Sequence, residues 1–113
     1  MPKFIRLASL TDKGAANVAN LKEMLGEAKQ AMAEHGVTLV DAYVTLEHYD
    51  VVAIIEAPDA EAATAASALI AAQGNFRAET LPATPVADFL RRVGGSYTAV
   101  GHKLRFLGGR SSC

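Results

Sequence analysis

The fold is decided by residues 42–59, which read AYVTLEHYDVVAIIEAPD. Two runs rich in β-branched and aromatic residues flank a short polar turn, which is typical of a β-hairpin. We predict strands over residues 37–46 and 49–57. Successive side chains of a strand point to opposite faces. The second strand is therefore apolar on both faces, with Val52 and Ile54 on one and Val51, Ala53 and Ile55 on the other.

The flanking segments complete the pattern. Strands are predicted over residues 3–10 and 76–81, the latter ended by Pro82. Thr11 or Asp12 is the candidate N-cap of a first helix, and Gly36 its C-cap. The expected apolar stripe of that helix contains Val18, Leu21, Met24, Leu25, Ala28 and Met32.

A second helix and a short third one follow the hairpin. Asp59 is the candidate N-cap of a helix that ends near Gln73, and Gly74-Asn75 closes it. Thr84-Pro85 predicts the start of a short helix through Val93.

This order, β-α-β-β-α-β, is the ferredoxin-like α+β plan, with a four-stranded antiparallel sheet behind two helices. We expect one domain over residues 1–93, followed by a tail over residues 94–113. In the strand 37–46, alternation places Leu39, Tyr43 and Thr45 opposite Val40, Ala42, Val44 and Leu46.

The helices cover one face of this sheet, and an uncovered apolar face would be larger than monomers usually expose. We therefore predict that a second subunit covers it, giving a homodimer or a higher homo-oligomer. The competing explanation is that residues 94–113 fold across the same face.

Composition narrows the class of protein. The 113 residues carry a net charge of −1, which argues against a generic nucleic-acid binder. No apolar run is long enough to cross a membrane. The single cysteine, Cys113, suits a reducing compartment, so we expect a soluble cytoplasmic protein.

Charge is unevenly placed along the chain. Residues 1–90 hold all 12 acids against 6 bases, whereas residues 91–113 hold 5 bases and no acid. A basic tail on an acidic body predicts docking on the domain or on a neighbouring subunit, or contact with an anionic partner.

The chain resembles the GYD-domain family, which is similar in fold to the dimeric α+β barrel group. The resemblance runs from about Lys3 to Thr84. It is carried by Thr11-Asp12-Lys13-Gly14, Ala42-Tyr43, the run from Tyr49 to Asp59, Gly74-Asn75-Phe76-Arg77 and Glu79-Thr80-Leu81. The resemblance implies membership and a dimeric α+β barrel assembly, but no generally established activity.

Two departures from the family pattern concern the turn and the first helix. The family's turn reads Gly-Glu-Tyr-Asp, and here Glu47-His48-Tyr49-Asp50 occupies it. Because a glycine that would permit a positive φ is missing, we expect a different turn type. The family's Asp-Ser-Pro is replaced by Asn20-Leu21-Lys22.

His48 is the candidate catalytic residue, because a histidine titrates near neutrality and can act as a general base or as a metal or haem ligand. Tyr49 and Asp50 follow it, so one hairpin presents an imidazole, a phenol and a carboxylate. The alternative is a solvated turn histidine.

Charged residues within the predicted strands form a second set of candidates: Arg6, Arg77, Glu56 and Glu79. They either line a polar pocket or make cross-strand ion pairs, and an Arg6–Glu56 or Arg6–Asp50 contact is feasible. We take Arg6, Tyr43, Tyr49 and Asp50 as candidate ligand-binding residues.

Metal and cofactor sites are not expected. His35, His48 and His102 lie far apart without ligand spacing, and no nucleotide-binding or nucleophile motif is present.

Three functions stay open. The first is an oligomeric module that binds a small ligand or a protein partner. The second, which the resemblance implies, is a small enzyme of the monooxygenase, dehydratase or isomerase type that uses His48, Tyr43 and Arg6. The third is an assembly or cargo protein that acts through the basic tail.

Overall fold

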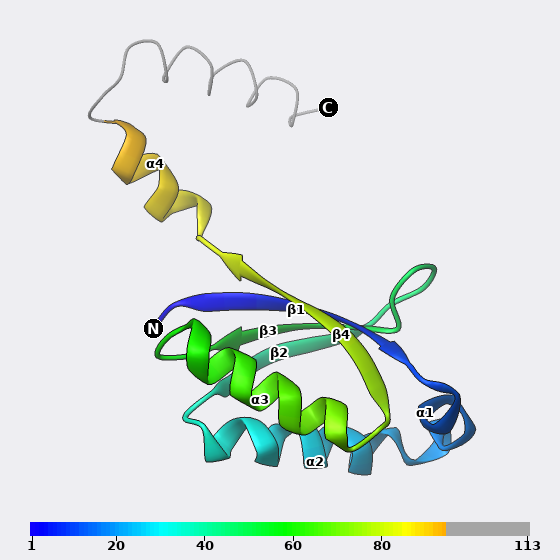
Figure 1. Ribbon diagram of the computed structural model, residues 1–113. Helices are drawn as coiled ribbons and strands as arrows, with labels where there is room; N and C mark the ends of the chain where they lie inside the picture. Colours follow the sequence, from blue (N-terminus) through cyan, green and yellow to red (C-terminus); the bar gives the residue numbers. More distant parts are fainter. Residues whose placement is uncertain (95–113) are drawn as a thin grey trace. The chain divides into compact units, whose positions relative to one another are not determined.

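The computed structural model describes residues 1–94, which fall into a unit of residues 1–83 and a second unit that begins at Thr84. The order of elements is the predicted β-α-β-β-α-β plan with a further helix (Figure 1). The strands are β1 Lys3–Leu10, β2 Thr38–Val44, β3 Val51–Glu56 and β4 Phe76–Ala83. The helices are α1 Asp12–Ala16, the 3-10 turn η1 Val18–Asn20, α2 Leu21–Glu34, α3 Ala60–Ala72 and α4 Val86–Gly94.

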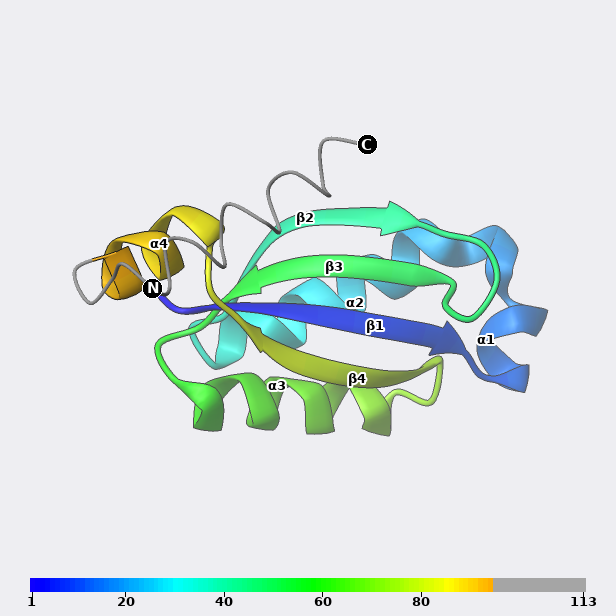
Figure 2. The ribbon, with the colours of Figure 1, turned by 90° about the horizontal axis from the view of Figure 1, so that it is seen from above.

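The four strands form one antiparallel sheet in the order β2-β3-β1-β4, with β1 and β3 at its centre (Figure 2). Helices α2 and α3 lie side by side on one face. The core between them contains the large side chains of Phe4, Met24, Met32, Ile55, Ile70 and Phe76. The predicted α+β architecture is therefore confirmed.

The helix ends follow the predicted capping chemistry. Thr11 Oγ1 accepts a hydrogen bond from the Gly14 amide at 3.1 Å, and Asp59 Oδ1 accepts one from the Ala62 amide at 2.8 Å. Gly36 and Gly74 follow α2 and α3 with φ angles of 70° and 84°, where a side chain would be strained.

The first helical segment differs from the prediction of one continuous stripe. It divides into α1, η1 and α2, and Val18, expected on the buried face, is 52% exposed. The 3-10 geometry of η1 changes the angle between successive residues, which shifts Val18 out of the stripe that Met24 and Met32 occupy.

Strand β2 contains an irregularity between Leu39 and Asp41, which leaves Val40 as an extra residue. Leu39 pairs with Ile55 and Ala42 with Ala53, so both lie on the helix-covered face. The prediction that Leu39 shares a face with Tyr43 is therefore wrong, because the irregularity reverses the alternation.

The sheet face away from the helices, here called the open face, carries a continuous apolar patch. Cross-strand pairing aligns its members, and no other element of residues 1–83 lies over them in Figure 2. Burial on this face is partial, with Tyr43 54% and Leu81 45% exposed. The patch consists of Ile5, Leu7, Tyr43, Val52, Ile54 and Leu81.

Strand β4 runs through Pro82 to Ala83, so the prediction that Pro82 ends the strand is wrong. Pro82 lies opposite Phe4 on an edge strand, where one side of the backbone has no neighbouring strand and a missing N–H is tolerated.

The second unit contributes α4 to the described residues. Its apolar side chains Val86, Phe89 and Leu90 are 72%, 46% and 40% exposed. The tail predicted over residues 94–113, with His102 and Cys113, lies outside the described residues except for Gly94. Among residues 1–94, no helix combines the length and apolar character that a bilayer crossing requires.

Candidate functional site

The turn between β2 and β3 holds three of the predicted site residues. His48 is exposed, and its side chain makes no hydrogen bond or ion pair with any other residue of the described part of the chain. Its backbone carbonyl accepts a hydrogen bond from Ser9 Oγ at 3.2 Å. The imidazole therefore has the surroundings of a solvated turn residue.

Asp50 has a structural partner. Its Oδ2 accepts a hydrogen bond from the Leu10 amide at 2.7 Å, and its own amide donates to the Ala8 carbonyl at 2.8 Å. The side chain thus supplies the partner that the end of β1 would otherwise lack, in the manner of a cap. Oδ2 of Asp50 is therefore occupied by a backbone hydrogen bond and is not available to a ligand.

The backbone of this turn contains the one positive φ angle among the non-glycine residues described, 77° at Glu47. This is the position where the family pattern has glycine. Glu47 therefore adopts the left-handed conformation that a glycine would permit, and the expected change of turn type stays a prediction. This conformation has a steric cost of about 1 kcal/mol.

The two tyrosines lie on the open side of the sheet. Tyr43 donates a hydrogen bond from its hydroxyl to Asp41 Oδ2 at 2.6 Å, and this bond, with the nearby negative charge, raises the pKa of the Tyr43 phenol. Tyr49 reaches Glu79 Oε2 at 3.4 Å. A shallow hollow of about 180 Å³ adjoins Tyr49 and is lined by Leu7, Ser9, Tyr49, Arg77, Ala78 and Glu79.

Arg6 lies on the opposite face of the sheet. It is 5% exposed, and its Nη1 donates to Ser67 Oγ at 2.6 Å and to Thr80 Oγ1 at 3.4 Å. Burial lowers the pKa of the Arg6 guanidinium. The structure therefore does not bring Arg6 together with His48, Tyr43, Tyr49 and Asp50 in one site.

Neither of the two contacts predicted for Arg6, with Glu56 or with Asp50, forms in the structure. Glu56 points to the open side and pairs across the strands with Lys3, with 2.6 Å between Lys3 Nζ and Glu56 Oε2. Asp50 is engaged by the Leu10 amide. The register of β1 against β3 pairs Arg6 with Ala53, on the face away from Glu56.

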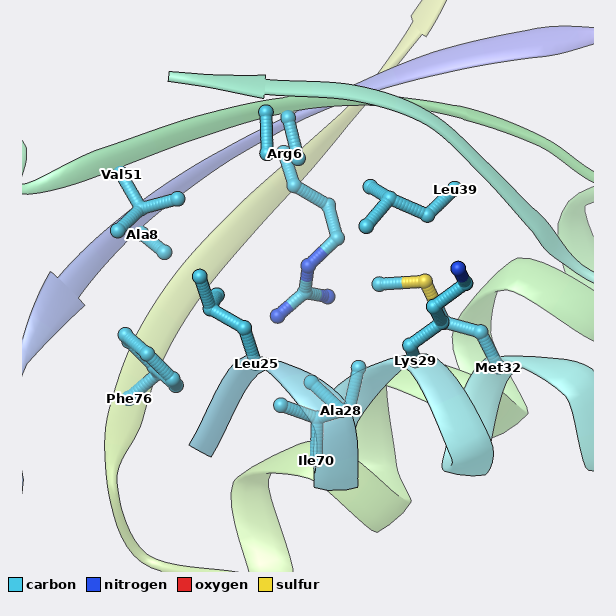
Figure 3. A pocket seen from close by; sticks show the side chains of 12 residues that line it. Arg6, Ala8, Leu25, Ala28, Lys29, Met32, Leu39, Val51, Ile70 and Phe76 are labelled. Atoms are coloured by element: carbon cyan, nitrogen blue, oxygen red, sulfur yellow. The ribbon is translucent and has the colours of Figure 1, made fainter. Parts of the chain in front are cut away.

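Arg6 borders a narrow cleft between the sheet and α2. The space in this cleft that water-sized molecules can occupy is about 30 Å³. In Figure 3 its guanidinium extends from β1 into the space between Leu25, Leu39 and Met32. Lys29 lies at the same cleft and is exposed. His48 and the two tyrosines do not line it.

Ser67 was missed as a partner for Arg6, although the sequence held a signal. It follows Ala63 by four residues on the inner face of α3, where Ala63, Ala66 and Ile70 are buried. A serine in an otherwise apolar stripe predicts a polar group across the interface.

Metal-ligating groups do not assemble in this part of the chain. Within residues 1–94, no three side chains of the His, Cys, Asp and Glu types come close enough to hold an ion. His35 and His48 belong to separate loops.

The residues that carry the family resemblance meet in space. Thr11 donates its amide to the Asn75 carbonyl at 3.0 Å and its hydroxyl to the Gly74 carbonyl at 2.5 Å. Lys13 Nζ donates to the Gln73 carbonyl at 2.8 Å. The two motifs thus join the end of β1 to the start of β4.

Comparison with known proteins gives two matches. The model of the family described as "GYD domain" matches residues 4–93. A relative from Thermus thermophilus is 38% identical over 94 residues, which cover 82% of this chain and 99% of the relative. That relative is named "Glutamine synthetase and cystathionine beta-lyase binding protein".

Proposed function

Because this chain belongs to the GYD domain family, we propose that it is a homodimeric protein-binding module without catalytic activity of its own. The observation that carries the proposal is the relative's name, which describes a binding protein, together with a match over 99% of that relative's length. By that similarity, the expected partners are enzymes of the glutamine synthetase and cystathionine β-lyase kinds.

The dimer is the first part of the proposal and depends on the open face. Its apolar patch spans all four strands and is only partly buried in the unit of residues 1–83. If about 800 Å² of a face were buried and half of it were apolar, the gain would be about 10 kcal/mol before association costs. That is enough for a stable dimer.

The open face also has the polar composition that a self-complementary interface needs. Lys3 and Arg77 supply positive charge, and Asp41, Glu56 and Glu79 supply negative charge around the apolar patch. In a twofold interface the same surface meets itself, so both signs of charge must be present for pairs to form. A second copy of this chain is therefore the proposed occupant.

The alternative of a small enzyme gains no support from the geometry. Its acid–base candidate, His48, is exposed on a turn, while Arg6 borders a cleft that His48 does not line. General acid–base catalysis requires such groups within hydrogen-bond reach of one substrate. A cofactor-free protein in the cytoplasm remains our prediction.

The test is direct binding to purified enzymes. Glutamine synthetase and cystathionine β-lyase from the organism that encodes this chain would be immobilised separately, and the full-length protein would be passed over each. We expect saturable binding to at least one, and none to an unrelated enzyme of similar charge. Absence of saturable binding to both enzymes at micromolar concentration would contradict the proposed partners.

A further inference from the structure

Binding to protein partners does not explain Arg6, a buried cation between the sheet and the helices. Arg6 is 5% exposed in the middle of β1, among residues of the hydrophobic core. Burying an arginine is unfavourable unless the charge is paired, so such residues normally face a carboxylate. No carboxylate of residues 1–94 forms an ion pair with Arg6.

The hydrogen bonds of Arg6 are confined to one corner of its guanidinium. Both use Nη1, and both acceptors, Ser67 Oγ and Thr80 Oγ1, are uncharged hydroxyls. A guanidinium has five N–H donors in a planar fork. Nε and Nη2 therefore retain donors that no described residue accepts, and Figure 3 shows the guanidinium extending into the cleft.

The cleft combines two cationic residues with an otherwise apolar lining. Two of its residues, Arg6 and Lys29, are cations, and none is acidic. The remaining walls are apolar and include Leu25, Met32 and Leu39. Space of about 30 Å³ is room for about two water molecules, so a carboxylate group fits inside and an aliphatic part would lie toward the mouth of the cleft.

We propose that this cleft binds a short-chain monocarboxylate, whose carboxylate accepts hydrogen bonds from the free N–H groups of Arg6 and whose aliphatic end packs against Leu25 and Met32. Arginine suits this role because its planar fork matches the two oxygens of a carboxylate. Lys29 at the mouth adds attraction for the incoming anion. The proposal concerns the isolated protein and does not depend on its protein partners.

Propionate is a suitable probe, with propionamide as its neutral isostere and sodium chloride at equal ionic strength as the control for simple anions. The readout is the NMR shift of the Met32 methyl group in the full-length protein. We expect a saturable shift with propionate and an affinity for propionamide lower by about tenfold or more, since hydrogen bonds to charged groups are the stronger ones.

Two variants separate the charge from the space. Arg6→Met replaces the charged side chain by an apolar one of similar length. The variant is expected to fold, because replacing a buried charge by an apolar group is often tolerated. It should lose the propionate response, while Lys29→Gln should weaken the response without abolishing it. If Arg6→Met does not fold, the wild-type comparison of propionate with propionamide still decides.

Three results would overturn the proposal: no saturable shift with propionate, an equal response to propionamide or to chloride, or an unchanged response in folded Arg6→Met. The first would mean that the cleft holds water alone. None of these results bears on enzyme binding or on the dimer, so the two proposals fail separately.

Discussion

Gly14 packs its Cα so closely against the carbonyl of Asn75 that a Cβ on residue 14 would lie 2.1 Å from that oxygen. The contact joins the segment after β1 to the segment before β4, beside the hydrogen bond from the Thr11 amide to the same carbonyl. This close contact between two backbone segments explains why residue 14 is glycine, because the atom that a Cβ would meet belongs to the backbone of Asn75 and not to a flexible side chain that could move away.

Gly14→Ala should therefore destabilise the protein by about 2–3 kcal/mol, at the upper end of the range for overpacked sites. Gly26→Ala is the matched control, because Gly26 lies in α2 with nothing within 4 Å of an added Cβ. The control should gain about 0.5–1 kcal/mol from helix propensity. Urea unfolding of both variants measures the difference, and equal stabilities would refute the proposed clash.

Glu47→Gly should stabilise the protein by about 0.5–1 kcal/mol. Glycine adopts the φ of 77° without the steric cost that Glu47 bears, although it loses more chain entropy on folding. Glu47→Ala removes the charge but keeps a Cβ, and it should change the stability by less than about 0.5 kcal/mol. A Glu47→Gly protein less stable than the wild type in thermal unfolding would argue against this turn geometry.

The Lys3–Glu56 pair predicts a dependence of stability on pH. The hydrogen bond from Lys3, with its positive charge, lowers the pKa of the Glu56 carboxyl below its ordinary value of 4.5. The pair therefore contributes its full stabilisation above about pH 4.5, and the contribution is lost as the pH falls through the lowered pKa in the folded state.

Carbon-13 NMR titration of the Glu56 carboxyl checks this assignment. In Lys3→Met, the midpoint should move up toward the ordinary value, and high salt should move the wild-type midpoint in the same direction because the pair is partly exposed. An identical midpoint in the two proteins would show that Lys3 is not the cause.

The elements that sequence reasoning predicted correctly are those with strong local signals. β1 was expected over residues 3–10 and has those bounds, and Asp59 caps α3 as its position before an alanine-rich run indicated. A capping side chain and a helical stripe are properties of neighbouring residues. Such features require no knowledge of what lies across the sheet.

The features that were mispredicted depend on distant residues. Leu39 was assigned to the wrong face because β2 is apolar on both sides near Val40, so alternation alone cannot reveal an extra residue. The sequence also predicts a strand end at Pro82, because edge and central strands look alike in sequence. The incorrect pairing of Arg6 with Glu56 reflects a cross-strand register that no local pattern specifies, since the register places Lys3 opposite Glu56.

The candidate ligand-binding residues do not gather at one place in the structure. Arg6 lies at a cleft, whereas Tyr43 and Tyr49 lie on the open side and Asp50 binds the Leu10 amide. Local sequence cannot show which of them lie together, because that depends on the face of the sheet that each side chain occupies. The pairing of Ile5 with Ile54 and of Leu7 with Val52 places the apolar groups of β1 and β3 together on the open face. That face supports the central claim of a homodimer.

Light scattering coupled to size-exclusion chromatography measures the oligomeric state of the wild type, Ile54→Glu and Leu46→Glu at micromolar concentration. Ile54 lies within the apolar patch, whereas Leu46 is 86% exposed in the turn and serves as the control for an added charge. We expect twice the 11.9 kDa chain mass for the wild type and Leu46→Glu, and the mass of one chain for folded Ile54→Glu. A wild-type protein with the mass of one chain, or a folded Ile54→Glu protein that stays dimeric, would contradict a homodimer formed through the open face.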